Sequence, residues 1–372
     1  MKPRLDLLIH PGLPKTATTW FQTGVLPRLP TVVNIGKGGA SVEYEDVRPV
    51  SRELRAKQYR VFSEVHDGES MYRRYRSSLP DLLDYRDCAV DLLARQRSHR
   101  EIDGHTVVVL SDETLGTSGG IEVNLGLLAG LITAFRDALD DEFDVHPHVV
   151  FTVREQKAWL QSYYAFSSRH LVNRHPDVHK FIAEGATDPQ GGVFGMLHFD
   201  QTFQMVRLAL AGMATVRLVP SEILSTCGGS AFVRQLLHFL GDEDPVLELA
   251  RMVADELTDA AINAAPRDGS ATIALNRSRG AFSINSAARS FSAITRRHGP
   301  VGALTRPLRG PLRLAYRAFF ETRLNDLGTG RGISVELSEE DSATIDEIFA
   351  ASNAEFARQA GIDLSALGYH CA

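Results

Sequence analysis

The sequence opens with a short apolar run, a break rich in proline and glycine, and a helical stretch, and this succession constrains the fold more than any other feature. Residues 5–10 are apolar except for one acid and predict a short buried strand. Pro11 and Gly12 interrupt the run, and apolar positions from Thr18 onward predict a helix that stops at Pro27. A strand, a loop and a helix in this order are the opening of a β-α-β unit.

Similar apolar runs recur along the chain, and helical patterns lie between several of them. Strands that alternate with helices favour a mostly parallel central sheet with helices on both faces. We therefore predict an α/β fold. The expected strands are residues 31–35, 106–110, 149–153 and 215–219, and the expected helices are residues 81–97, 123–139, 231–240 and 338–359.

A chain of 372 residues is long enough for one large α/β domain or two small ones. Residues 263–335 differ from the rest because they are rich in Arg, Gly and Pro. We interpret them as loops and short helices that decorate the core. The prediction is a single domain over residues 1–372.

The composition narrows the class of protein. The formal net charge of −6 argues against broad nucleic-acid binding, which usually accompanies a basic surplus. The three cysteines form no CxxC pair, which favours a reducing compartment over a disulfide framework or a structural zinc site. The sequence shows neither a signal-peptide core nor an apolar stretch of the roughly 20 residues that span a bilayer. We expect a cytoplasmic protein without a transmembrane segment.

The loop of residues 12–19 has a composition suited to bind an anion. Between a strand and a helix, it would direct backbone N–H groups and the positive helix end toward one point. Lys15 adds a charge, and the threonines add neutral donors. An ordinary β-α turn with a surface lysine explains a bare cluster of this kind equally well. A Walker A loop is absent in its strict form, because Pro14 replaces the glycine before the lysine.

A second anion-binding pattern follows the expected strand 149–153. Arg154 comes at its carboxyl end, where α/β proteins bind ligands, and Ser162 lies eight residues later on an expected helix. A guanidinium offers a bidentate fork to a phosphate, and a hydroxyl offers a further donor. Either residue alone would be unremarkable, and Arg154 alone would be explained by a structural salt bridge.

Residues 14–20, Pro-Lys-Thr-Ala-Thr-Thr-Trp, resemble the 5′-phosphosulfate loop of sulfotransferases that use 3′-phosphoadenosine 5′-phosphosulfate (PAPS), and His10-Pro11-Gly12-Leu13 is similar to the bacterial variant. Arg154 with Ser162 resembles the pair that binds the 3′-phosphate. The resemblance implies a P-loop-NTPase-like three-layer fold, with PAPS as co-substrate. Ala17 replaces the usual glycine; we expect it to fit a helical first turn and slightly narrow the approach to the phosphate. The implied cofactor-binding residues are Lys15, Thr16, Ala17, Thr18, Thr19, Trp20, Arg154 and Ser162.

A weaker likeness to the family extends over most of the chain. Residues 217–224 and 239–241 resemble its strand, acidic turn and helix, and residues 352–355 with Gly368-Tyr369 resemble the ends of bacterial members. The loop containing Gly and Lys that many cytosolic members fold over the cofactor is not evident. Arg277 and Arg279 are candidates to replace it, with a solvated loop as the equal alternative.

The resemblance implies in-line sulfuryl transfer from PAPS to a hydroxyl or amine, with release of 3′,5′-adenosine bisphosphate. Such a transfer should need charge stabilisation and a base that takes the acceptor proton. Lys15 would stabilise the bridging oxygen as the bisphosphate leaves. Glu113, at the end of a strand, is a candidate base, although it would equally cap the following turn. His66 ranks beside it and Glu64 below both. No metal is expected, because the leaving group is already a stable phosphate.

Two other functions fit the same motifs. Lys15-Thr16 with Asp112 resembles the parts of a P-loop kinase or NTPase that uses Mg-ATP. A non-catalytic nucleotide-binding protein with a degraded sulfotransferase fold is the third possibility. The acceptor stays open among small molecules, lipids and glycans, and an oligomer is compatible with the sequence. Residues 296–323 hold seven arginines and one acid, which favours a surface or subunit interface over a guide for an anionic acceptor.

Overall fold

A computed structural model of the chain describes residues 2–13, 16–36, 50–54, 57, 64–66, 73–75, 79–100, 105–112, 115, 121–171, 177–264, 272–273 and 333–371. The chain forms two compact units. The first comprises Met1–Leu160, Ala183–Arg267 and Glu340–Ala372, and the second comprises Gln161–Ile182 and Asp268–Glu339. The second unit contains most of residues 263–335, and their assignment to a single domain stays a prediction.

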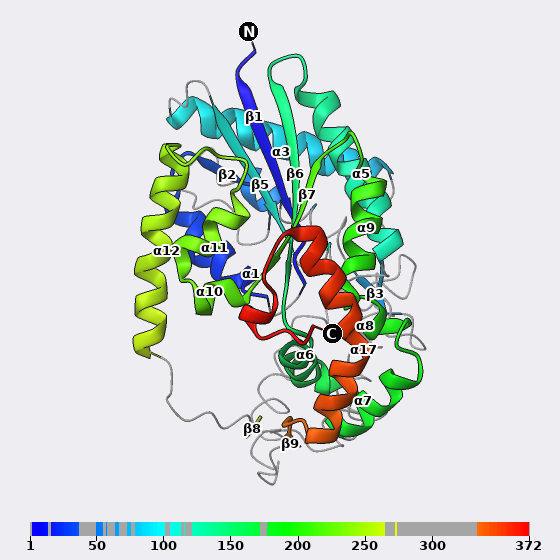
Figure 1. The fold of residues 1–372 in the computed structure, drawn as a ribbon. Helices are drawn as coiled ribbons and strands as arrows, with labels where there is room; N and C mark the ends of the chain where they lie inside the picture. Colours follow the sequence, from blue (N-terminus) through cyan, green and yellow to red (C-terminus); the bar gives the residue numbers. More distant parts are fainter. Residues whose placement is uncertain are drawn as a thin grey trace, which may run out of the picture. The chain divides into compact units, whose positions relative to one another are not determined.

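The first unit is built on a parallel sheet of five strands, which confirms the predicted α/β class (Figure 1). Its strand order is β2-β5-β1-β6-β7, so the strand before the candidate loop is central. A central parallel strand is covered on both faces, which is why its sequence is a continuous apolar run. The strands are β1 (Arg4–His10), β2 (Val32–Asn34), β5 (Thr106–Ser111), β6 (Asp144–Val153) and β7 (Thr215–Pro220).

Helices cover both faces of this sheet and give the three-layer architecture (Figure 1). On one face lie α3 (Leu79–Arg100), α5 (Ile121–Leu139) and α9 (Phe199–Ala209). On the other lie the turn η1 (Phe21–Val25), α11 (Gly229–Leu236) and α12 (Pro245–Ala264). The predicted helix 231–240 ends early, at Leu236, because Leu237 leaves the helical conformation.

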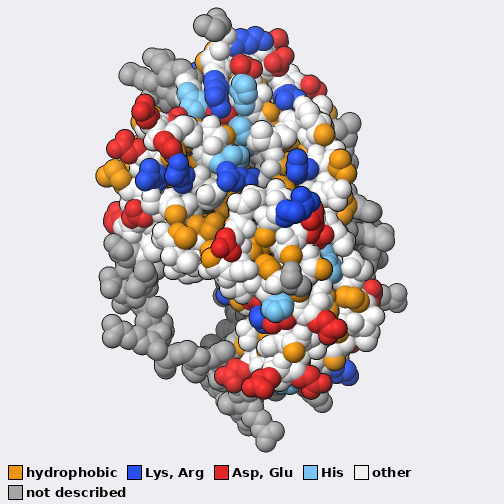
Figure 2. Space-filling model, viewed as in Figure 1, with side chains coloured by type: hydrophobic (Ala, Val, Ile, Leu, Met, Phe, Trp, Pro, Cys, Tyr) orange, Lys and Arg blue, Asp and Glu red, His pale blue; other side chains and the backbone are white. Residues whose placement is uncertain are grey.

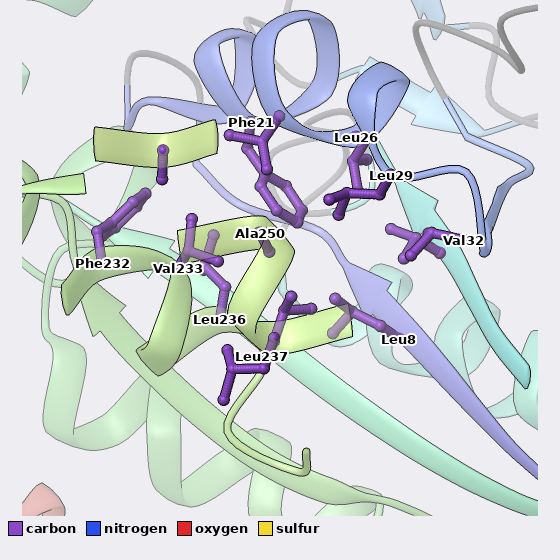
Figure 3. Close-up of a cluster of buried hydrophobic side chains, with 14 of the residues drawn as sticks. Leu8, Phe21, Leu26, Leu29, Val32, Phe232, Val233, Leu236, Leu237 and Ala250 are labelled. Carbon is purple, nitrogen blue, oxygen red and sulfur yellow. The ribbon is translucent and has the colours of Figure 1, made fainter. Parts of the chain in front are cut away.

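The core beneath α11 and α12 fastens the start of the chain to the sheet. Leu8 of β1 and Phe21 of η1 are fully buried there, beside Phe232 and Ala250 (Figure 3). Truncating a buried phenylalanine to alanine typically costs about 3–5 kcal/mol. The loop between Leu8 and Phe21 is therefore held at both ends by buried side chains.

The helix after the loop is irregular. It comprises α1 (Thr18–Trp20), the π-helical η1 and the 3₁₀ turn η2 (Leu26–Arg28). The predicted stop at Pro27 is one residue early, since Pro27 occupies one of the first positions of η2, where its missing N–H costs nothing. π-helical turns are rare in proteins as a whole, and those that occur are often found at functional sites.

The remaining elements are short or peripheral to the sheet. No helix in the described ranges combines the length and the apolarity that crossing a membrane requires. Two small antiparallel pairs are β3 (Glu64–His66) with β4 (Arg73–Tyr75), and β8 (Thr272–Ile273) with β9 (Ile333–Ser334). The other helices are α6 (Gln156–Leu171), α7 (Val178–Thr187), α8 (Gly192–Gly195), α10 (Glu222–Thr226), α17 (Glu339–Ala360) and the 3₁₀ turn η4 (Ser365–Leu367).

Candidate functional site

The loop that follows β1 is fastened to the neighbouring strand β6. The Leu13 N–H donates a hydrogen bond to the Thr152 carbonyl at 3.0 Å. Gly12 approaches Thr152 and Thr18 so closely that a β-carbon would overlap both side chains. Position 12 therefore has room only for a glycine. The close contact also fixes the direction in which the backbone leaves β1.

Ala17 adopts a left-handed backbone conformation, with φ 60° and ψ 11°. Among the described residues it is the only one other than glycine with a positive φ. The expectation that Ala17 fits a helical first turn is therefore wrong: it precedes α1 as its N-cap. An alanine in this conformation costs roughly 1–2 kcal/mol, and non-glycine residues held this way cluster at functional sites.

Beneath the loop, five buried polar side chains form one hydrogen-bonded chain. The contacts are Gln22 Nε2 to Ser111 Oγ (3.0 Å), Ser111 Oγ to His10 Nδ1 (2.8 Å), His10 Nε2 to Thr152 Oγ1 (3.3 Å), Thr152 Oγ1 to Thr16 Oγ1 (2.7 Å), and Thr16 Oγ1 to the Leu13 carbonyl. None of the five side chains is more than 2% exposed. Burying a polar group without a partner costs free energy. The five side chains are therefore held in the orientations that keep these hydrogen bonds.

The direction of the protons along this chain follows from its two ends. At one end, the Gln22 amide donates to Ser111, and at the other, the Thr16 hydroxyl donates to a carbonyl. All five contacts are satisfied if Ser111 donates to His10 Nδ1, His10 Nε2–H donates to Thr152, and Thr152 donates to Thr16. His10 is then a neutral imidazole with its proton on Nε2.

Burial lowers the pKa of His10 to about 3, in keeping with a neutral ring. The Thr16 hydroxyl is directed inward by the same chain, so its proton is not offered to a ligand. Of the other predicted loop residues, Thr18 is buried, Thr19 is exposed, and Trp20 packs its ring 6.0 Å from that of Phe232. The loop can still offer an anion its backbone N–H groups, the exposed Thr19 hydroxyl and the charge of Lys15.

A cavity of about 460 Å³ opens beside the loop, within the first unit. It brings Ala17 of the loop and Arg154 of the second motif into one site, although the two lie far apart in the sequence. Two of the elements that contribute to it are α10 and the C-terminal turn, residues 364–369. In Figure 1 both lie near α1, below the carboxyl ends of the strands. The lining residues are Ala17, Arg154, Glu155, Ala158, Ser221, Glu222, Ser225, Leu367 and Gly368.

Arg154 is held from both sides by the turn that follows β7. The Ser221 N–H donates to the carbonyl of Val153 at 2.8 Å, and the N–H of Glu155 donates to Glu222 Oε1 at 3.1 Å. The peptide units before and after Arg154 are therefore both fixed. The backbone at Arg154 is therefore held in place where this residue lines the cavity.

The Glu155 carboxylate caps the start of α6. It accepts hydrogen bonds from the N–H groups of Lys157 (3.0 Å) and Ala158 (2.8 Å). Burial raises the pKa of Glu155, which these two bonds partly oppose. Because the carboxylate occupies these two N–H groups, the positive charge that the segment offers to a ligand is that of Arg154.

Several residues that the sequence predicted for the site are not among the residues that line the cavity. Ser162 lies on α6 in the second unit, half-buried, and its part in the site stays a prediction. Glu64 and His66 form β3, but their side chains lie outside the described residues. Asp112 is buried, and its N–H donates to the carbonyl of His10 at 3.1 Å. Outside the described residues lie Pro14, Lys15, Glu113, Arg277, Arg279 and residues 296–323.

Sequence reasoning named Glu222 and Gly368 only as points of family likeness and gave His10 no chemical role. The only local signals were an acid soon after a strand and a histidine at the end of an apolar run. Their functions depend on partners from distant segments, which periodicity does not reveal. In the described ranges, no three His, Cys, Asp or Glu side chains gather as a metal site would require.

The sequence matches no protein-family model, and no curated protein matches it significantly. Any functional assignment therefore depends on the residues of the loop and the cavity.

Proposed function

We propose that this protein is a PAPS-dependent sulfotransferase that transfers the sulfuryl group to a hydroxyl or amine of an acceptor and releases 3′,5′-adenosine bisphosphate. One observation carries the proposal: Ala17 of the loop and Arg154 line the same cavity. Two motifs that resemble opposite ends of one family's nucleotide site thus converge in space. The acceptor classes that we propose are a small molecule, a lipid or a glycan, and the proposed location is the cytoplasm.

The cavity is lined by one arginine, Arg154, and two acids, Glu155 and Glu222, so the proposal requires that the acids have partners within the protein. Glu155 accepts two backbone N–H bonds, and Glu222 accepts the N–H of Glu155 and the hydroxyl of Tyr369. Both carboxylates are therefore already engaged by protein donors. Arg154 adds the positive charge that a phosphate needs.

In the proposed reaction, the acceptor oxygen or nitrogen attacks the sulfur of PAPS in line with the bond to the bridging oxygen. That bond breaks, and its electron pair leaves on the phosphate of 3′,5′-adenosine bisphosphate. Lys15 stabilises the charge that develops on this oxygen. The acceptor proton passes to a base, for which Glu113 and His66 remain the first candidates and Glu64 the next.

The geometry favours this proposal over a kinase or NTPase. A P-loop enzyme holds Mg²⁺ through the hydroxyl that follows its lysine, which here is Thr16. The Thr16 hydroxyl is fully buried and is engaged by Leu13 and Thr152. A non-catalytic nucleotide-binding protein with the same fold stays the alternative, and the transfer assay below distinguishes it from an enzyme.

Radiolabelled sulfate transfer from PAPS to a panel of hydroxyl and amine acceptors tests the proposal. Arg154→Ala should raise the KM for PAPS about tenfold or more, since a hydrogen bond to a charged group contributes about 1.5–3 kcal/mol. Lys15→Ala should instead lower kcat, by about a hundredfold. Arg234→Ala is the matched control, because this exposed arginine pairs with Asp242. Unchanged kinetics in both site variants would refute the proposal.

A further inference from the structure

The C-terminal turn, residues 364–369, forms one wall of the cavity. Leu367 and Gly368 line the cavity directly. The turn is firmly seated, because the side chain of Leu364 is fully buried and that of Tyr369 is 3% exposed. The Tyr369 ring packs edge-on to Phe199, with ring centroids 6.4 Å apart. This wall is therefore part of the folded core and not an appended tail.

The end of the chain is also tied to the start of α6. The Asn353 side chain of α17 donates to the carbonyl of His370 at 3.0 Å. The same side chain exchanges hydrogen bonds with Gln156, the first residue of α6, at 2.7 and 3.2 Å. All of these groups belong to the first unit. The C-terminal turn is thus linked to the segment that immediately follows Arg154.

A second link runs from Tyr369 to the peptide beside Arg154. The Tyr369 hydroxyl donates to Glu222 Oε2 at 2.9 Å, and Glu222 Oε1 accepts the N–H of Glu155 at 3.1 Å. One carboxylate therefore bridges the C-terminal turn and the backbone of the residue next to Arg154. Burial and the charge of Glu222 raise the pKa of Tyr369 well above its ordinary value, so the hydroxyl keeps its proton.

We propose that Tyr369 and Glu222 are positioning residues that aim Arg154 at the 3′-phosphate of the nucleotide, and that the C-terminal turn closes this side of the cavity. The inference rests on the proposed function. Many cytosolic members of the family cover the cofactor with a loop, and the sequence suggested only Arg277 and Arg279 as its replacement. The inference gives this role to the C-terminal turn instead. It makes the end of the chain a determinant of nucleotide specificity.

The test compares two probes, 3′,5′-adenosine bisphosphate and 5′-AMP, which lacks the 3′-phosphate. Their dissociation constants are measured by isothermal titration calorimetry with EDTA present. Tyr369→Phe removes one hydroxyl and keeps the ring. We expect it to weaken the bisphosphate about five- to tenfold, the effect of one hydrogen bond, and to leave 5′-AMP within about twofold. The preference for the 3′-phosphate therefore falls selectively.

Tyr85→Phe is the matched control, because Tyr85 is fully buried and donates its hydroxyl to the Ile35 carbonyl at 2.8 Å. It should lower stability and leave the ratio of the two dissociation constants unchanged. Glu222→Ala is the second variant: it removes both acceptor oxygens, so it should reproduce the selective loss seen in Tyr369→Phe.

Failure of the inference and failure of the proposed function give different results. If the wild-type protein binds the bisphosphate no more tightly than 5′-AMP, the proposed function is wrong. If the wild type prefers the bisphosphate and both variants keep the full preference, the positioning role alone is refuted. An equal loss of affinity for both probes also refutes it, because that result reports a merely structural contact.

Discussion

The two ends of strand β1 carry similar residue types in opposite electrostatic states. At its carboxyl end, His10 is neutral and bonded to hydroxyl groups beneath the loop. Near its amino end, the buried Asp6 accepts hydrogen bonds from Arg4, His105 and His148. One histidine environment contains only uncharged partners, and the other contains a buried carboxylate.

The amino end is a closed ionic cluster. Burial alone would raise the pKa of Asp6, but hydrogen bonds from His148, Arg4 and His105 outweigh it and hold the pKa at about 2. The His148 ring also contacts the Thr215 hydroxyl at 2.7 Å. Figure 2 shows histidine side chains gathered among Lys and Arg over the upper part of the face, where β1 begins in Figure 1.

This contrast separates an end occupied by internal partners from the end where we propose that the nucleotide binds. At the amino end, the Asp6 carboxylate is fully occupied by partners within the protein. At the carboxyl end, the five polar groups under the loop are uncharged, and the cavity beside them is lined by Arg154 together with the acids Glu155 and Glu222. The sheet thus anchors its strands with ion pairs at one end and keeps the other end available for an anion.

Removing the charge at the amino end should produce the largest loss of stability. Asp6→Asn removes the buried carboxylate that accepts hydrogen bonds from Arg4, His105 and His148, and breaking a buried pair of this kind typically costs about 3–5 kcal/mol. Urea unfolding measures this change. Asp242→Asn, which breaks an exposed pair with Arg234, should change the free energy of unfolding by less than about 1 kcal/mol. A small loss in Asp6→Asn would show that the cluster is not an ionic anchor.

Lowering the pH should reduce the stability contributed by His10 and by Asp6 over different pH ranges. Between pH 6.5 and about 3, the unfolded chain binds a proton at His10 that the folded protein excludes. The His10 contribution to stability is therefore full above pH 6.5 and falls by up to about 1.4 kcal/mol per pH unit below it. The Asp6 contribution is lost only as the pH falls from about 4 toward 2.

Urea unfolding of the wild type, His10→Gln and Asp6→Asn at pH 6.5, 5.5 and 4.5 tests this distinction. The difference in unfolding free energy between the wild type and His10→Gln should shrink as the pH is lowered, because Gln does not titrate. The difference for Asp6→Asn should not shrink over the same range, because Asp6 stays ionised in both the folded and the unfolded protein above about pH 4. Parallel behaviour of the two variants would abolish the contrast between the two ends.

The smallest predicted effect concerns the loop itself. Ala17→Gly should stabilise the protein by up to about 1 kcal/mol, because glycine adopts a positive φ without the steric penalty of a β-carbon. Ala158→Gly serves as a control of opposite sign, since a glycine within α6 should destabilise by about 0.5–1 kcal/mol. Urea unfolding compares both variants, and a loss of stability in Ala17→Gly would contradict the strain assigned to this position.

The sequence predicted the parts of the fold that depend on local apolar pattern. The runs at β1, β5 and β6 are nearly continuous because parallel strands are buried on both faces, and they identified the sheet and the position of Arg154 at a strand end. The conformation of Ala17 was not predictable in this way. It depends on how the loop packs against Thr152, a contact between segments far apart in the chain.

The sequence predicted the two motifs of the candidate site but not how they are placed relative to each other. Their convergence on one cavity follows from the adjacency of β1 and β6 in the sheet, which a single sequence does not specify. The Tyr369–Glu222 bond was equally hidden, because it joins the end of the chain to the turn after β7. Side-chain hydrogen bonds of this kind leave no periodic signal in the residues that form them.

Thermal unfolding with added nucleotide tests the central claim most directly. We predict that 3′,5′-adenosine bisphosphate raises the melting temperature in the presence of EDTA, with a stabilisation of about 2.7 kcal/mol at a hundred times its Kd. Mg-ATP should stabilise much less, and Arg154→Ala should remove most of the effect of the bisphosphate. Stabilisation by Mg-ATP alone, with none from the bisphosphate, would contradict the assignment of a PAPS-dependent sulfotransferase.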